Sequence, residues 1–241
     1  MAEPSRKSRD EDKWVRRLYL PAYSVSEAAM LAQVDPRTVS RWFYGYLTSA
    51  GRRADRVLGD RKRRVPLSYL QLVEVAFVAS MRQLGVALNR IRVAHEYLST
   101  RFGVEYPFAQ LRLKTDGVEV LKDLEDVEGR WVTRLLVASR CGQVVWAEPI
   151  ADRIREFDYH DALKLAIRWF PRGRGTPIMV DPRVQFGAPV LADSGVPTWV
   201  IRERRRAGES LGEIEEGFGV DLVAIRHALE FEGLRAATTG A

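Results

Sequence analysis

This chain has few cysteine and histidine residues, two residue types that many catalytic and metal sites contain. Its 241 residues contain one cysteine, Cys141, which excludes an internal disulfide and favours a reducing cytoplasm. Its three histidines, His95, His160 and His227, lie far apart in sequence and have no metal-ligand spacing. Glycine-rich phosphate loops and nucleophile-elbow motifs are also missing from the sequence. We therefore expect no catalytic activity, no metal and no cofactor.

Long apolar runs are missing as well, and their absence predicts a chain without a transmembrane helix. Residues 1–13 are charged, so we expect a disordered lead-in there rather than a secretory signal. What the chain has in excess is positive charge, with 38 Lys and Arg against 32 Asp and Glu. A net charge of +6 favours a polyanionic partner, although a GC-rich genome would also enrich arginine.

The distribution of this charge is more informative than its total. Between Arg37 and Arg64, nine Arg or Lys occur with two Asp, a local excess of +7 that exceeds the net charge of the whole chain. Most of them lie in 48–65, which we interpret as a loop or a two-stranded wing. The basic residues of this wing are Arg52, Arg53, Arg56, Arg61, Lys62, Arg63 and Arg64. If they neutralise roughly six phosphates, log affinity for DNA falls against log salt with a slope near −5.

Two short helices separated by a tight turn are predicted just before this wing. Ser24 and Glu27 have the spacing of a capping box, and Asp35 followed by Pro36 is typical of a second helix start. In a helix-turn-helix the second helix enters the major groove of DNA. Its candidate base-reading residues are Arg37, Thr38, Ser40, Arg41 and Tyr44. The alternative is a plain helical hairpin that only packs, and the adjacent basic stretch favours the DNA-reading interpretation.

Further along the chain the pattern changes twice. Residues 66–85 and 86–103 have helical spacing, whereas "FAQLRLKT", "GVEVLKD", "WVTRLLVAS", "GQVVWAEPI" and "ALKLAIRWFP" have strand signals. Three helices are predicted after residue 197, with Thr198, Ser210 and Asp221 as their capping residues. We predict an α+β fold with a winged helix-turn-helix at 14–105, a small β-rich middle module at 106–180, a three-helix domain at 181–235 and a tail at 236–241.

The motifs of the first part resemble a known family. "YSVSEAAMLAQVDPRTVSRWF", the basic wing and "MRQLGVALNRIR" are similar to the MerR-type winged helix-turn-helix over about residues 21–100. The wing is longer than in that family, and no long coiled-coil helix with an effector domain follows. This resemblance implies a homodimer that binds a palindromic operator.

The C-terminal stretch resembles a small bacterial domain of initially unknown function that occurs in VapB-type antitoxins. The matching residues are Asp181, Pro182, Gly187, Pro189, Gly195, Pro197, Gly208, Ile214, Val223 and Ala228. The stretch "ADSGVP" departs from the family pattern, since many relatives have Gly-Thr-Arg there. The resemblance implies a ribonuclease partner of the PIN class, with Arg202, Arg205, Arg206 and Arg226 as candidate toxin-binding residues. A solvated arginine-rich helix face is the alternative for these four.

Two functions are compatible with these features. The first is a cytoplasmic antitoxin that neutralises a PIN-class ribonuclease and represses its own operon by DNA binding. The alternative is a one-component MerR-like regulator whose middle module binds a small effector in a pocket lined by Trp131, Trp146 and Trp169. Tryptophans of this kind are more often core or interface residues than ligand contacts.

Overall fold

The computed structural model describes residues 13–47, 51, 53–54, 56–59, 64–119, 121, 135–138 and 144–234. The chain divides into two compact units, an N-terminal unit over residues 1–167 and a C-terminal unit over residues 168–241. Helices and short two-stranded sheets occur together, which confirms the predicted α+β class. None of the helices in the described ranges is long and apolar enough to cross a membrane.

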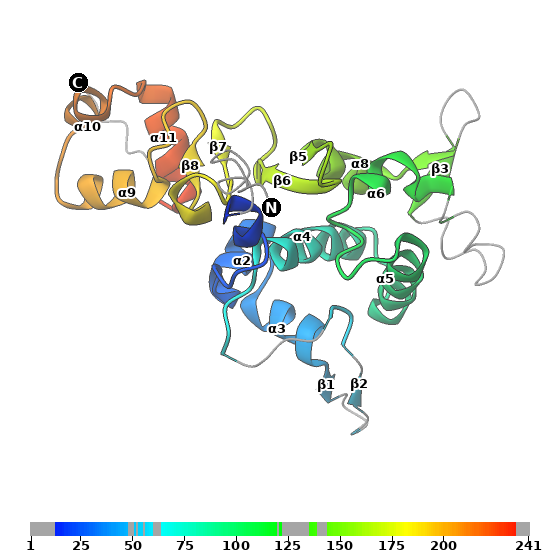
Figure 1. Ribbon diagram of the computed structural model, residues 1–241. Coiled ribbons are helices and arrows are strands. Elements are labelled where there is room, and N and C mark those ends of the chain that lie inside the picture. Colours follow the sequence, from blue (N-terminus) through cyan, green and yellow to red (C-terminus); the bar gives the residue numbers. More distant parts are fainter. Residues whose placement is uncertain are drawn as a thin grey trace, which may run out of the picture. The chain divides into compact units, whose positions relative to one another are not determined.

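The N-terminal unit is built around one buried helix. Its elements are α2 (Val25–Ala32), α3 (Pro36–Tyr44), β1 (Tyr46–Leu47), β2 (Arg53–Ala54), α4 (Tyr69–Gln83), α5 (Leu88–Phe102), α6 (Leu111–Thr115), β3 (Leu136–Ala138), β4 (Val144–Trp146), α8 (Glu148–Arg155), β5 (Phe157–His160) and β6 (Leu165–Trp169). The last two residues of β6 belong to the C-terminal unit. Helix α4 packs against α2, α5 and α8. Figure 1 shows α3 and the β1–β2 hairpin on the opposite side of α4 from α8.

Helix α4 forms where the apolar spacing predicted a helix. Ser68 and Gln71 form a capping box at its start, because the Ser68 hydroxyl accepts from the Gln71 amide and the Gln71 side chain accepts from the Ser68 amide. Nearly every side chain from Tyr69 to Met81 is buried, so the helix is covered on all sides. Each Å² of apolar surface that is buried stabilises a fold by about 25 cal/mol. A helix that is covered on all sides therefore contributes strongly to the stability of this unit.

One carboxylate is buried on this helix. Glu74 is 2% exposed; one of its oxygens accepts from the backbone amide of Phe108 at 2.9 Å, and the other lies 2.8 Å from Nε2 of His95. Burial by itself lowers the pKa of His95, but the Glu74 carboxylate outweighs burial and raises this pKa above its ordinary value. The pair joins α4, α5 and the segment after α5 by polar contacts inside an apolar core.

This pair predicts a pH-dependent stability. A raised histidine pKa contributes stability that is fully present below about pH 6.5, the ordinary value, and is lost as pH rises through the folded-state pKa. We expect the urea midpoint of the full chain to fall between pH 6 and pH 9. The variant His95→Gln should lose most of this dependence over the same range. An unchanged pH profile in that variant would contradict the prediction.

The strands predicted for residues 108–123 are wrong where the structure describes them. Residues 111–115 form helix α6, and residues 117–119 are also helical. The buried positions Leu113, Gly117 and Leu121 are four apart, which is a helical period that the Leu-Arg-Leu alternation obscured. Strands β3, β4 and β6 do form inside the predicted stretches, but residues 148–150 of "GQVVWAEPI" begin α8 instead.

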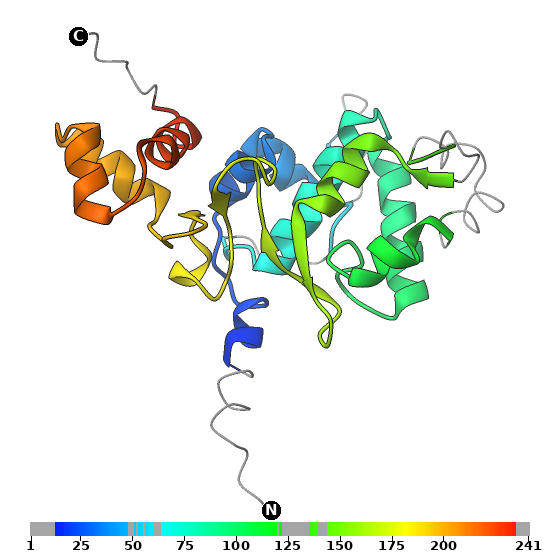
Figure 2. The same ribbon diagram turned by 90° about the horizontal axis from the view of Figure 1, so that it is seen from above.

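The C-terminal unit joins a short hairpin to three helices. Its elements are β7 (Ile178–Met179), the 3-10 turn η2 (Gln185–Gly187), β8 (Val190–Leu191), α9 (Thr198–Arg206), α10 (Leu211–Phe218) and α11 (Leu222–Phe231). Figure 2 shows these three helices as one group, and α11 packs against both α9 and α10. Ser210 with Glu213 and Asp221 cap α10 and α11 as predicted.

The predicted cap of α9 is wrong. Pro197 is the N-cap residue, and no side chain caps the helix. The Thr198 hydroxyl instead donates to the Glu232 carboxylate at 2.6 Å, because Thr198 is fully buried against the end of α11. A tertiary partner has therefore replaced the local capping bond.

Candidate nucleic-acid interface

Helices α2 and α3 form two short helices with a tight turn between them. Gln33 ends α2 in the left-handed conformation, with φ 57°, and Asp35 begins α3 by accepting from the Arg37 amide at 2.7 Å. The predicted capping box of Ser24 and Glu27 is present at the start of α2. Because the turn is closed at both sides by capping interactions, the direction of α3 relative to α2 is well determined.

One face of α3 is buried and the other is basic. Val39, Trp42 and Phe43 pack in the core, at most 2% exposed. Arg37 and Arg41 are exposed on the other face, one helical turn apart. The remaining predicted residues of this helix, Thr38, Ser40 and Tyr44, are half-buried. An exposed helix face with arginine at its first turn matches the chemistry of major-groove reading, since arginine donates to guanine O6 and N7.

The wing begins directly after α3. Strands β1 and β2 pair antiparallel, with Tyr46 opposite Ala54 and Leu47 opposite Arg53. Of the predicted basic residues, Arg56 and Arg64 are exposed, and Arg64 has a positive φ of 68°. Arg53 lies in β2, whereas Arg52, Arg61, Lys62 and Arg63 lie outside the described residues.

An apolar anchor that the sequence reasoning missed attaches this wing to α3. Val57 and Leu58 are buried, and both of their backbone amides donate to the Trp42 carbonyl, at 2.8 and 3.0 Å. The sequence feature that could have predicted this anchor is an apolar Val-Leu pair inside an arginine-rich stretch. This contact fixes the segment that follows β2 to the last turn of α3, in the same unit as Arg37 and Arg41.

The tryptophans of the suggested effector pocket do not form one described group. Trp169 is fully buried in the C-terminal unit, and Trp146 is 9% exposed in the N-terminal unit. The Trp146 ring lies so close to Gly117 that a Cβ there would come within 2.7 Å of it. Trp131 lies outside the described residues. The two described rings therefore act as core side chains.

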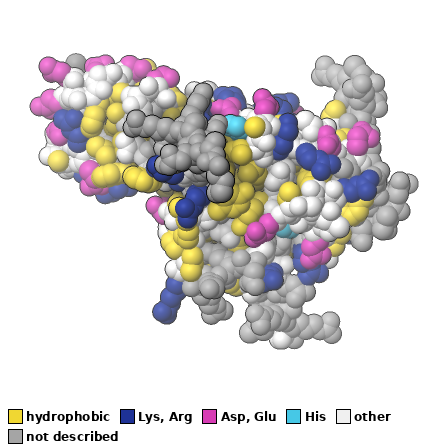
Figure 3. Space-filling view, viewed as in Figure 1, with side chains coloured by type: hydrophobic (Ala, Val, Ile, Leu, Met, Phe, Trp, Pro, Cys, Tyr) yellow, Lys and Arg dark blue, Asp and Glu magenta, His cyan; other side chains and the backbone are white. Residues whose placement is uncertain are grey.

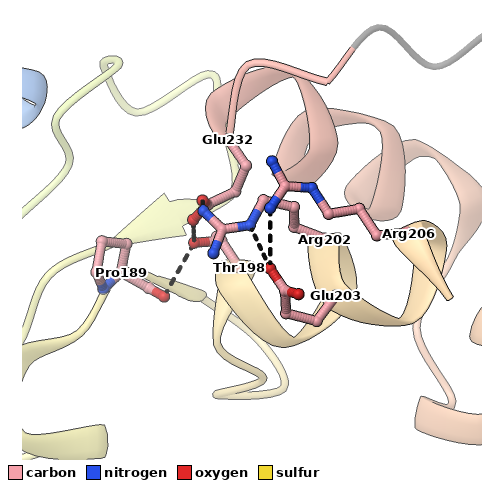
Figure 4. A network of polar contacts seen from close by, with 6 residues as sticks. All are labelled: Pro189, Thr198, Arg202, Glu203, Arg206 and Glu232. Atoms are coloured by element: carbon pink, nitrogen blue, oxygen red, sulfur yellow. Dashed lines mark hydrogen bonds and ion pairs between the residues drawn. The ribbon is translucent and has the colours of Figure 1, made fainter.

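Three of the four candidate toxin-binding arginines make bonds inside the C-terminal unit. Arg202 bonds to Glu232 at 2.6 Å and to Glu203 at 2.9 Å, and Arg206 also reaches Glu203, at 3.3 Å (Figure 4). Arg205 donates to the Glu209 carbonyl at 2.9 Å. Arg226 is exposed on α11, and within the described ranges it makes no ion pair.

The surface of the C-terminal unit around α10 is acidic. Figure 3 shows Asp and Glu side chains gathered around this helix. The exposed Glu213 and Glu216 are among them, and Arg204 is held by an ion pair with Glu209 and by the ring of Phe218 at 4.7 Å. An acidic surface repels phosphate, so the C-terminal helices are poorly suited to a second DNA contact.

The chain is similar to proteins of known sequence along most of its length. Residues 178–231 match the family described as a protein of unknown function, DUF433. A protein of Mycobacterium tuberculosis (strain ATCC 25618 / H37Rv) named "Putative antitoxin VapB45" is 26% identical over 228 residues, which cover 89% of this chain and 95% of that protein. The uncharacterized protein Rv2308 of the same organism is 25% identical over 221 residues, 87% of this chain and 89% of that protein.

A solved structure has a similar fold. The crystal structure of Rv2018 from Mycobacterium tuberculosis superimposes with a TM-score of 0.72 at 25% identity, covering 88% of this chain and 99% of that chain. Both units of the present chain therefore have counterparts in proteins of similar length.

Proposed function

We propose that this chain is the antitoxin of a toxin–antitoxin pair, which binds and neutralises a PIN-class ribonuclease and represses its own operon. The observation that carries the proposal is the nearly end-to-end similarity to a protein named as an antitoxin, over 89% of this chain and 95% of that protein. Similarity of this extent includes both compact units rather than one shared domain.

The DNA-binding part of the proposal depends on α3. Its exposed arginines, Arg37 and Arg41, lie opposite a buried face, and the wing follows within the same unit. As a homodimer, the protein would place two such helices about 34 Å apart, which is the spacing of half-sites in a palindromic operator.

The toxin-binding part falls to the C-terminal unit. Arg202, Arg205 and Arg206 are engaged within the unit, so breaking their bonds would offset part of any gain from binding. Of the four predicted arginines, Arg226 is the one whose contact with a toxin would cost no bond within the described residues.

Co-expression with the product of the neighbouring gene tests the proposal. We expect that product to stop growth when expressed alone, and growth to return when this chain is present, with both proteins eluting together. The double variant Arg37→Ala/Arg41→Ala serves as the matched control, because it should lose operator binding and still restore growth. A neighbouring product without toxicity, or toxicity that this chain leaves unchanged, would overturn the antitoxin assignment.

A further inference from the structure

One aromatic side chain of the C-terminal unit lies largely at the molecular surface. Phe186 is 78% exposed, the largest exposed fraction among the large apolar side chains in the described part of the chain. Phe157 and Phe108, by comparison, are at most 2% exposed. A phenylalanine ring with this exposed fraction contributes little buried apolar surface to the fold, so its position calls for a physical reason.

The backbone beneath this ring is strained. Gln185 and Phe186 have φ angles of 44° and 53°, in the left-handed region that residues with a Cβ rarely adopt, and Gly187 follows with 86°. Two successive non-glycine residues in this region are uncommon, and each costs free energy that the surrounding structure must offset. Strain of this kind gathers at binding and catalytic sites more often than elsewhere.

The surrounding turn is firmly held. Asp181 is fully buried; its carboxylate accepts from the amide and the guanidinium of Arg183, and its carbonyl accepts from the Val184 amide at 2.9 Å. The Gly187 amide in turn donates to the Val184 carbonyl at 2.9 Å. Pro182 and Gly187, on either side of the turn, are buried. The ring is therefore presented by a rigid turn, which reduces the entropy lost when a partner binds it.

We propose that Phe186 is an anchor side chain for the toxin, inserted into an apolar pocket of that protein. The inference rests on the proposed antitoxin function and identifies the surface through which that function operates. The turn lies inside the 178–231 segment that matches the DUF433 family. Rigidly presented aromatic side chains in the centre of an interface supply a large share of binding energy.

Two other occupants fit the surroundings less well. Proteins that stack nucleic-acid bases on aromatic rings also present a cationic groove to the phosphates. Here the nearby Arg168 and Arg183 both bond to Asp181, at 3.2 and 2.7 Å, and so are engaged within the unit. Insertion of the ring into a second copy of this chain would need an apolar pocket there. The pocket described in the C-terminal unit is lined by Arg172, Thr176, His227, Glu230 and Phe231, which are mostly polar or charged and suit a phenylalanine ring poorly.

The test measures binding of the full chain to the neighbouring-gene ribonuclease, inactivated in its nuclease site so that both proteins can be produced. We expect Phe186→Ala to weaken this binding by roughly 30-fold or more, the loss typical of an aromatic anchor. Leu20→Ala is the control, because Leu20 is a 51% exposed apolar side chain outside the C-terminal unit that is proposed to bind the toxin, and the affinity of this variant should stay within threefold of that of the unmodified chain. Phe186→Gly should lose as much affinity as Phe186→Ala. Its melting temperature should be no lower than that of the unmodified chain, because glycine relieves the strained φ.

The outcomes separate this inference from the proposed function. If the unmodified chain fails to bind the ribonuclease, the antitoxin function itself is wrong, and the anchor with it. If the unmodified chain binds and Phe186→Ala binds equally well, the function stands and the anchor is wrong. Loss of self-association or of DNA binding, with toxin binding intact, would assign the ring to a second copy or to nucleic acid instead.

Discussion

Replacing Arg37 or Arg41 by alanine is expected to weaken binding to operator DNA by ~1–3 kcal/mol each, which is the contribution of a good arginine–guanine contact. Both side chains are exposed, and the core face of α3 with Val39 and Trp42 is left intact, so the fold should be unaffected. Fluorescence anisotropy with labelled DNA from upstream of the chain's own gene measures the effect.

The control for this experiment carries the same change of charge. Arg155 is 67% exposed on α8, in the same unit but on the far side of α4 from α3 (Figure 1). Arg155→Ala should leave operator affinity within about 0.5 kcal/mol of the unmodified chain, as is usual for a change away from the contact surface. If all three variants lose the same affinity, the effect is one of net charge, and α3 is not the reading helix.

Replacing Asp181 by asparagine is expected to destabilise the C-terminal unit by about 2–3 kcal/mol. The Asp181 carboxylate is fully buried and accepts from Arg183 at 2.7 and 2.9 Å and from Arg168 at 3.2 Å. An amide carries no charge and cannot accept all of these bonds. Both guanidinium groups are about one-third exposed and can be solvated, which keeps the expected loss below that of a fully buried pair.

The same variant makes an acid-side prediction. Burial by itself raises the pKa of Asp181, but the hydrogen bonds and charge of Arg183 outweigh it and hold this pKa below its ordinary value. A lowered carboxyl pKa contributes stability that is present above about pH 3.9, the ordinary value, and is lost as pH falls through the folded-state pKa.

Urea unfolding at pH 7 and across the range from pH 5 to pH 2 measures both effects. Asp193→Asn, an exposed aspartate of the same unit, is the control and should behave as the unmodified chain does. If Asp181→Asn matches that control at neutral pH, the buried carboxylate does not stabilise the unit.

Features that depend on neighbours along the chain could be predicted from the sequence alone. The capping box of Ser24 and Glu27, the Asp35–Pro36 start of α3 and the cap of Ser210 with Glu213 were all predicted and are all present. Each involves a side chain and a backbone amide within three residues, so local spacing is sufficient to identify it. The amphipathic pattern of α3 likewise separated the buried Trp42 from the exposed Arg41.

Where a segment has several local options, contacts made in the folded chain select among them. Residues 111–115 carry an alternating pattern, yet they are helical because burial recurs every four positions across Leu113, Gly117 and Leu121. Arg202 and its partner Glu232 are separated by 30 residues, and so no spacing rule connects them. Contacts between distant residues determine both, because the energy that selects them exists only after the chain has folded.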